Sequence, residues 1–258
     1  MRSALQITRA VIYALVLREF LGRVMKRRMG AVWLLLEPFV HITVLTLFFT
    51  YIRGRTIVGM EYPIYLITGL VPFLLFRNNA QRLIDAVSAN RGLFAYKQIK
   101  PFDAFVARSI VETAIQIAVY GLLLLGFGWA GFDVSVHQPI EWLVVLSLGL
   151  LFSFGLGIIL AVIVNALPDT RSFISMMFLP LYFISGVVYP PSALSPEYLP
   201  LLLWNPFLHI MELTRTFVFE HYTPVAGISF RYVVESTVCS LFIALGIYRV
   251  RRMKLLAI

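Results

Sequence analysis

Several long apolar stretches run through this sequence and are separated by short polar connections. A helix needs about 20 mostly apolar residues to cross the hydrocarbon layer of a membrane. The segment 62–76 is a weak candidate because it is short and holds Pro63 and Pro72, although we expect its helix to continue through Asn78 and Arg82 into water. The sequence therefore predicts an all-α integral membrane protein with six transmembrane helices, at residues 33–52, 62–76, 104–129, 142–167, 173–189 (slightly short) and 232–248.

The composition agrees with a membrane protein and argues against other classes. Charged residues make up 14% of the 258 residues, against about 25% in soluble domains. The single cysteine, Cys239, excludes an intrachain disulfide framework and a zinc site built on several thiolates. The net charge of +9 is explained by basic residues that contact anionic lipid headgroups, so no nucleic-acid partner is predicted.

Lysine and arginine are distributed unevenly around the six predicted spans. They gather before the first span, between the second and third, and after the last, whereas the other side holds Arg53, Arg55, Arg215 and Arg231. Basic residues concentrate on the cytoplasmic side of membrane proteins. This distribution predicts a multi-pass membrane protein with both termini in the cytoplasm.

The first 29 residues predict an amphipathic helix that lies in the membrane interface, ahead of a six-span domain at residues 30–258. Apolar residues recur at steps of three and four, as one face of a helix requires. Arg18 interrupts this face, where it either reaches a lipid phosphate or helps to hold an anionic substrate. The apolar face consists of Ile7, Val11, Ala14, Leu17, Leu21 and Val24.

The connection between the fifth and sixth spans, residues 190–231, is unusually apolar. Pro200 and Pro206 interrupt it, so it is not expected to span the membrane alone. Irregular backbone at membrane depth is tolerated only where protein or a water-filled cavity covers it. We expect short re-entrant or interfacial helices on the outer side; the alternative is an ordinary hydrophobic loop on the membrane surface.

Ionisable residues inside spans are costly and need a reason. Glu37 and His41 share a helix face in the first span, and they either line a path or form a structural hydrogen bond. Two ligands without a third make a weak metal site, so no metal is predicted. Three further pairs are expected, and each joins residues about one helical turn apart: Arg108 with Glu112, Arg231 with Glu235, and Glu212 with Arg215, which we favour over a zinc site at His209 and Glu212.

Most aromatic residues lie near predicted span ends, where an interfacial belt is expected. Phe39, Phe48, Tyr182 and Phe183 lie deeper. There they either pack in the core or offer rings on which a passing sugar chain stacks.

The basic elbow NRGLFAYKQIKPFD, residues 90–103, separates the second and third spans. No G-x-x-x-x-G-K-[ST] phosphate-binding loop occurs in the chain. We therefore expect a separate soluble subunit to dock on the elbow. Leu93, Phe94, Tyr96 and Ile99 would supply an apolar plug, while Arg91, Lys97 and Lys100 orient the partner, and Pro101 would end the short helix before Asp103 caps the next one.

Four motifs carry a resemblance to a known family: MGAVWLLLEP (29–38), NRGLFAYKQIKPFD (90–103), ISGVVYPPSAL (184–194) and WNPFLHIMELTR (204–215). In order and spacing they resemble the permease subunits of ABC-2 polysaccharide exporters, in particular those of group 2 capsular polysaccharide export (the KpsM type). The resemblance covers almost the whole chain. It implies an ABC-2 (type V exporter) transmembrane domain.

The resemblance implies a homodimer of this chain with two copies of a separate ATPase, which binds ATP and Mg. Residues 90–100, beginning at Asn90, would form the coupling helix, and residues 190–215 the outer gate, with Trp204, Asn205, His209, Glu212 and Arg215. The cargo would be an anionic polysaccharide on a lysophosphatidylglycerol–Kdo anchor, passed to periplasmic and outer-membrane partners. Its entrance and path would use Arg18, Arg23, Arg27, Arg28, Trp33, Glu37, His41, Phe39, Phe48, Tyr182 and Phe183.

Other functions remain open at this point. An exporter of O-antigen or teichoic acid shares the first motif. A self-sufficient channel or carrier needs charged relays through the spans, which the sequence does not offer. A membrane enzyme would use Glu37 with His41 or His209 with Glu212, but we expect a transport subunit with no catalytic residue.

Overall fold

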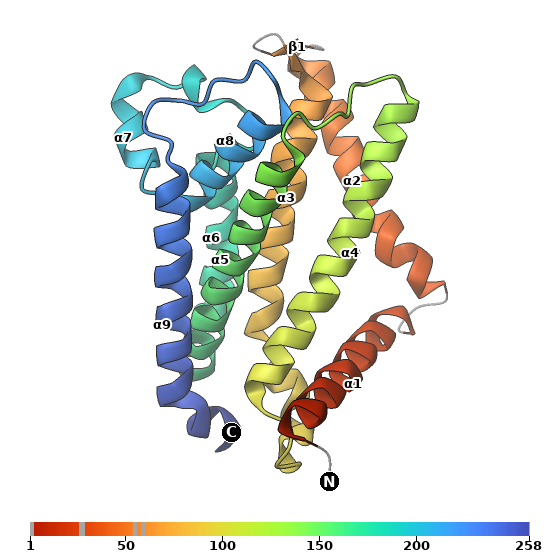
Figure 1. The fold of residues 1–258 in the computed structure, drawn as a ribbon, viewed down its shortest axis with the longest axis vertical. Helices are drawn as coiled ribbons and strands as arrows, with labels where there is room; N and C mark the ends of the chain where they lie inside the picture. Colours follow the sequence, from red (N-terminus) through yellow and green to blue (C-terminus); the bar gives the residue numbers. More distant parts are fainter. Residues whose placement is uncertain (1–2, 26–28, 54–55, 58–59, 258) are drawn as a thin grey trace.

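The computed structural model describes residues 3–25, 29–53, 56–57 and 60–257. It is a mostly helical bundle (Figure 1). The only strands in the described part are two strands of two residues each, which pair in antiparallel fashion. The helices are α1 (Ala4–Val24), α2 (Gly30–Arg53), α3 (Tyr62–Ile84), α4 (Pro101–Trp129), α5 (Pro139–Ala166), α6 (Thr170–Ile184), α7 (Leu199–Leu202), α8 (Pro206–Val218) and α9 (Phe230–Ala257). The shorter elements are the 3-10 helices η1 (Ser88–Ala95), η2 (Pro191–Ala193) and η3 (Pro196–Tyr198) and the strands β1 (Thr56–Ile57) and β2 (Met60–Glu61).

The start of α1, the 3-10 helix η1 and the end of α9 lie at one end of the molecule, which we call the basal end (Figure 1). The β1–β2 hairpin, the loop between α4 and α5, and α7 lie at the opposite, apical end. The start of α1 and the end of α9 therefore lie on the same side of the bundle.

The central helix of the bundle is α3, which packs against α2, α4, α5 and α8. Its apical half is buried from Tyr62 to Phe73. It passes through Pro72 and continues to Ile84, as the sequence predicted. Burial of its apical half explains how one helix can carry both prolines. The polar run from Arg77 to Arg82 is partly turned toward the bundle interior, with Asn79 buried and Arg82 exposed.

Four helices of the described part are long and apolar enough to cross a membrane: Val32–Ile52, Pro101–Trp129, Pro139–Ala166 and Phe230–Leu255. The two other predicted spans fall short of this criterion. The central helix α3 has 23 residues but carries the polar run, and α6 has only 15 residues. The predicted end of the fifth span at residue 189 is wrong, because the helix ends at Ile184 and the chain turns at Gly186, whose φ is +68°.

Small residues let α5 pack closely on its neighbours. A side chain at Gly155 would collide with Ser240 of α9, and one at Gly157 would crowd Ala80 of α3. Small residues at helix contacts are typical of membrane bundles, where close packing replaces the hydrophobic effect as the source of stability. These contacts hold α3, α5 and α9 together as one unit.

The connection between α6 and α9 is helical in part, as the sequence predicted. The helix α8 is buried from Phe207 to Arg215 and packs against α3, α5 and α9 near the apical end. Asn205 begins it, since its side chain accepts a hydrogen bond from the Phe207 N–H at 3.0 Å. Because α8 is enclosed by three long helices, its many backbone groups are shielded from the surroundings.

Candidate functional site

A cavity of about 320 Å³ lies between α1, α2, α3 and α4. We call it the charged cavity. It brings together four residues that the sequence analysis assigned to an entrance or path, namely Arg23, Trp33, Glu37 and His41. The other charged or amide side chains that line it are Arg77, Asn78, Arg82, Glu112 and Gln116.

Cationic groups outnumber anionic ones in the charged cavity, since three arginines accompany two glutamates. Arg77 donates to the neighbouring Asn78 Oδ1, at 3.3 Å from Nε and 3.2 Å from Nη2. The Arg82 side chain is 60% exposed, and its Nε lies 3.7 Å from Glu112 Oε2. The cavity is therefore suited to an anionic group more than to a cation.

Arg23 and Glu112 in the wall of the charged cavity belong to an ion-pair cluster between α1 and α4. The cluster is formed by Glu19, Arg23, Arg108 and Glu112. Arg23 Nη1 lies 2.7 Å from Glu112 Oε2, and its Nη2 lies 3.3 Å from Glu19 Oε1. Arg108 Nε lies 3.3 Å from Glu19 Oε2. The predicted pair between Arg108 and Glu112 within α4 is wrong, because α1 packs along α4 and offers each of these groups an oppositely charged partner.

The packing of α1 differs from that of a helix held only by its apolar face. Its charged side, with Glu19 and Arg23, is turned toward α4. Leu17 and Leu21 of its apolar face are 44% and 41% exposed, respectively. The helix thus presents apolar side chains to the surroundings and ion pairs to the protein, which is compatible with a position in the membrane interface.

The elbow is built around η1, which ends at Ala95, and α4 starts at Pro101. Pro101 therefore begins the next helix and does not end the short one, while Asp103 Oδ2 accepts from the Lys100 N–H at 2.9 Å. Asn90 is buried and donates from Nδ2 to the Ala86 carbonyl oxygen at 2.7 Å. Arg18 Nη2 donates to the Ala89 carbonyl oxygen at 3.0 Å. The 3-10 helix η1 is thus bonded to the turn that follows α3 and to α1.

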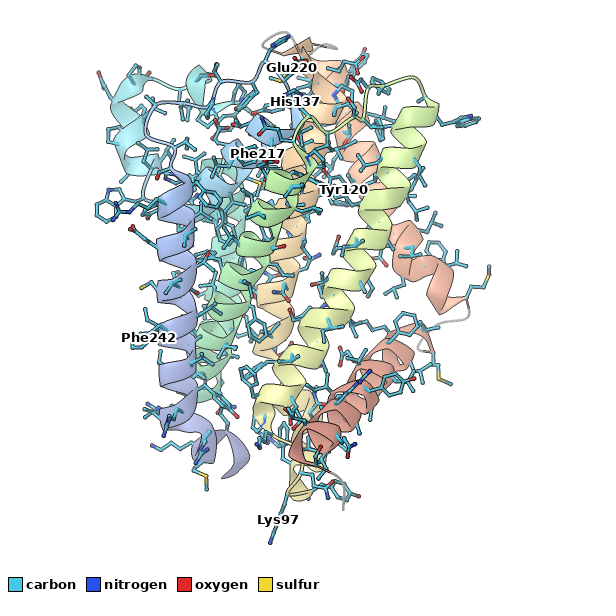
Figure 2. All side chains as sticks on the ribbon, viewed as in Figure 1. Lys97, Tyr120, His137, Phe217, Glu220 and Phe242 are labelled. Carbon is cyan, nitrogen blue, oxygen red and sulfur yellow. The ribbon has the colours of Figure 1, made fainter. Side chains whose placement is uncertain are left out.

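The predicted apolar plug of the elbow has two sides. Tyr96 is 65% exposed, and Arg91, Lys97 and Lys100 are exposed as well; Figure 2 shows Lys97 projecting from the basal end. Phe94 is partly buried against the core that joins α3, α4, α5 and α9. Leu93 and Ile99 line a groove of about 490 Å³ that the elbow shares with Ile7, Val11 and Arg18 of α1.

A second charged group lies near the apical end, around Arg215 of α8. We call it the apical cluster. The Arg215 side chain is fully buried, and its Nη1 lies 3.3 Å from Glu212 Oε1, so the predicted Glu212–Arg215 pair is confirmed. Its guanidinium donates to the carbonyl oxygens of Gly186 at 2.7 Å and Val187 at 2.9 Å, and it lies 3.8 Å from the centre of the Tyr65 ring.

Hydrogen bonds extend the apical cluster into the connection that follows α8. Tyr222 Oη donates to Glu212 Oε1 at 2.7 Å. His209 Nε2 lies 2.9 Å from the Leu203 carbonyl oxygen, and its Nδ1 accepts from the Ser229 N–H at 3.0 Å. A carbonyl oxygen only accepts, so these partners require a neutral imidazole protonated on Nε2. Burial lowers the pKa of His209, which favours that neutral form.

The sequence matches the model of the ABC-2 type transporters over residues 10–219. This chain belongs to the ABC-2 type transporter family.

Relatives of this ABC-2 transporter are similar along nearly their whole length. The polysialic acid transport protein KpsM of Escherichia coli is 36% identical, over 97% of this chain and 96% of KpsM. The capsule polysaccharide export inner-membrane protein BexB of Haemophilus influenzae is 25% identical, over 95% and 92% of the two chains. CtrC of Neisseria meningitidis serogroup B, which carries the same description, is 27% identical over 83% and 80%.

Four other residues that were predicted to line the path do not line the charged cavity: Phe39, Phe48, Tyr182 and Phe183. Phe39 lines a separate apolar hollow with Leu122 of α4, and Phe48 is 56% exposed. Tyr182 packs edge-on against Phe73, with ring centres 5.4 Å apart, and Phe183 packs on Tyr182. Trp204, which was predicted for the outer gate, is exposed, and its carbonyl oxygen accepts from Tyr232 Oη at 2.9 Å. Arg27 and Arg28 lie outside the described residues.

Several residues of both clusters were missed by the sequence analysis. Arg77 and Arg82 were treated as the edge of a weak span, although an arginine within a span indicates a functional position. Glu112 was noted but assigned a different partner. Tyr65 and Tyr222, which surround the ion pair of α8, carry no sequence signal that distinguishes them from interfacial aromatics.

Proposed function

We propose that this chain is the transmembrane permease subunit of an ATP-driven exporter, which moves lipid-linked anionic capsular polysaccharide across the bacterial inner membrane. The similarity to KpsM over 97% of the chain supports this proposal. Since the sequence has no phosphate-binding loop, ATP and Mg would be bound by a separate ATPase, and this chain would not be an enzyme.

In the proposed complex, two copies of this chain form a homodimer with two copies of the ATPase. The six spans would be α2, α3, α4, α5, α6 and α9, with α1 in the inner interface. The basal end would face the cytoplasm, because the basic residues of the elbow and of the C-terminal end of α9 gather there. The short helices α7 and α8 would then form a re-entrant gate on the outer side.

The observation that carries the proposal is the excess of arginine in the charged cavity. An anionic sugar or phosphate would be attracted to Arg77 and Arg82. Arg77 is hydrogen-bonded to an amide, Asn78, and Arg82 lies 3.7 Å from Glu112, whereas Arg23 lies 2.7 Å from the same carboxylate. Bidentate guanidinium groups suit carboxylates and phosphates in particular. The charged cavity would therefore be part of the entrance for the acidic glycolipid.

Coupling to ATP hydrolysis would use the contacts of the elbow. Movement of the docked ATPase would shift η1, which is bonded to α1 through Arg18 and Ala89. The ion-pair cluster of Glu19, Arg23, Arg108 and Glu112 would carry that shift into α4 and change the shape of the charged cavity. The cargo would leave on the outer side toward periplasmic and outer-membrane partners.

The test is complementation of a capsulated bacterium that lacks its own permease. We expect surface polysaccharide to return when this chain is expressed with its ATPase, and to stay absent when the ATPase lacks its phosphate-binding lysine. Export without any active ATPase would contradict the proposal in favour of a carrier. Export of an O-antigen or a teichoic acid alone would correct the cargo but not the mechanism.

Replacing Tyr96 with alanine should weaken docking of the ATPase. An exposed aromatic anchor at an interface contributes about 2 kcal/mol, or roughly 30-fold in Kd. The matched control is Tyr51→Ala, which removes a tyrosine that is 92% exposed at the other end of the bundle. Kd between permease and ATPase in detergent, measured by microscale thermophoresis, should rise for Tyr96→Ala only; equal Kd values for both variants would show that the elbow does not dock.

A further inference from the structure

The helices α4 and α5 follow one another in the chain but separate toward the apical end. Figure 1 shows α4 leaning away from α5 and α3 as it rises. The helix α4 packs against α1, α2 and α3 and hardly against α5. Between α3, α4 and α5 the structure contains a cavity of about 340 Å³, which we call the α4–α5 wedge.

The walls of the α4–α5 wedge are mostly apolar. Leu75 of α3, Ile117 of α4 and Leu143, Leu146 and Leu150 of α5 line it. A cavity needs several polar partners to hold ordered water. Since α4 and α5 are both long and apolar enough to cross a membrane, the wedge would open sideways into lipid, and an acyl chain is the natural occupant of such a space.

Three residues that line the wedge carry buried polar atoms without a hydrogen-bond partner in the described part of the chain. They are the Thr113 hydroxyl, the Gln116 side-chain oxygen and the Trp142 indole N–H. Unsatisfied buried polar groups are uncommon and indicate a missing partner. The ester carbonyls of a glycerolipid accept hydrogen bonds, so they can supply the missing partner of the Trp142 N–H, whereas the Gln116 oxygen is itself an acceptor and also lines the charged cavity.

The positions of these residues give the occupant a direction. Trp142 lies near the apical start of α5, and its ring packs edge-on against Tyr120, with centres 5.8 Å apart. Figure 2 shows Tyr120 on the side of α4 that faces α3 and α5. The part of α5 between Trp142 and Leu150 is about 12 Å long. This length accommodates a large part of one acyl chain.

We propose that a membrane glycerophospholipid inserts one acyl chain into the α4–α5 wedge. Its ester region lies at Trp142, and its chain runs past Gly121 toward Gln116. The chain fills the space that would otherwise separate α4 from α5. It thereby lets α4 tilt with α1 without leaving a void, which would be costly in a close-packed bundle. This inference does not depend on the identity of the exported cargo.

Gly121 offers a direct test, because a side chain added there meets no atom within 4 Å and would enter the wedge without a clash. Gly246 of α9 is equally open but lies outside the wedge, so Gly246→Leu is the matched control. Both changes replace a helical glycine by a better helix former. Any difference between the two variants therefore reports on the wedge.

The experiment places the full-length chain in vesicles of phosphatidylethanolamine and phosphatidylglycerol that contain a phospholipid with a diazirine in one acyl chain. After illumination, mass spectrometry should find adducts on Leu146, Ser147 and Leu150. Each methylene excluded from the site costs about fourfold in occupancy. Gly121→Leu should thus lower these adducts on the order of tenfold, and Gly246→Leu should leave them unchanged.

Equal adduct yields in the two variants would overturn the proposal. So would disulfide formation between two copies of a Ser147→Cys variant in a Cys239→Ala background, because it would show that a second chain covers the wedge. The same experiment can be repeated with a diazirine on a one-chain acidic glycolipid. If that lipid formed adducts and the two-chain phospholipid formed none, the proposal would also be overturned, because the occupant would then be the cargo.

Discussion

Replacing Arg215 with methionine is expected to lower the free energy of unfolding by about 3–5 kcal/mol, because it leaves the Glu212 carboxylate buried without its cation. The change also removes the donors that satisfy the carbonyl oxygens of Gly186 and Val187. Both Glu212 and Arg215 are 0% exposed, so water cannot replace the lost contacts. Urea unfolding in mixed micelles, followed by circular dichroism, measures the effect.

Two further variants sharpen that experiment. Arg231→Met breaks a pair with the same chemistry, but the Arg231 side chain is 86% exposed, and little change is expected. Arg215→Met combined with Glu212→Leu removes both charges together and should recover a large part of the loss. If Arg215→Met proved as mild as Arg231→Met, the apical cluster would not be a closed, water-free network.

The second large effect concerns Arg23, where charge reversal is expected to stop export. Arg23→Glu would place a third carboxylate beside Glu19 and Glu112, of which Glu112 is 3% exposed. Disruption of such a buried pair costs about 3–5 kcal/mol, which is enough to detach this part of α1 from α4. Surface polysaccharide in the complementation strain, together with protease cleavage between α1 and α2, reports both consequences.

A charge swap distinguishes two roles for Arg23. Arg23→Glu with Glu112→Arg restores an ion pair between the same two helices and should recover much of the export if the arginine acts by joining α1 to α4. If the swap restores folding but not export, the arginine contacts the cargo directly. Arg9→Glu, an exposed arginine on the same helix, is the control and should export normally.

Features that depend on local sequence were predictable. The helix in residues 4–24, the pair of Glu212 with Arg215 and the continuation of the second span past Phe76 all follow from periodicity or from a spacing of one helical turn. The end of α6 was not, because Val187 and Val188 are as apolar as a span requires. The turn at Gly186 is instead fixed by Arg215, which holds the carbonyl oxygens of Gly186 and Val187 from a helix far along the chain.

In the candidate site, too, local sequence predicted some residues, while others depend on contacts between distant parts of the chain. Glu37 and His41 were predicted as a pair on one face, and both line the charged cavity. Their neighbours Arg77 and Glu112 come from other helices, and no local pattern brings them together. The partner of Glu112 is Arg23, 89 positions away, whereas the nearest arginine in sequence is Arg108. Choosing between them needs the packing of α1 on α4, which sequence periodicity does not give.

The polar basal half of α3 bears on how the protein is made. An arginine at the centre of an isolated membrane helix carries an insertion penalty of about 2.5–3.5 kcal/mol; Arg77 lies inside α3 in the wall of the charged cavity, whereas Arg82 lies in the last turn of the helix. Within the finished bundle, α2, α4 and α5 surround this helix, but during synthesis α4 and α5 emerge only later. The polar basal part of α3 is therefore enclosed by its neighbours only after α4 and α5 have packed beside it.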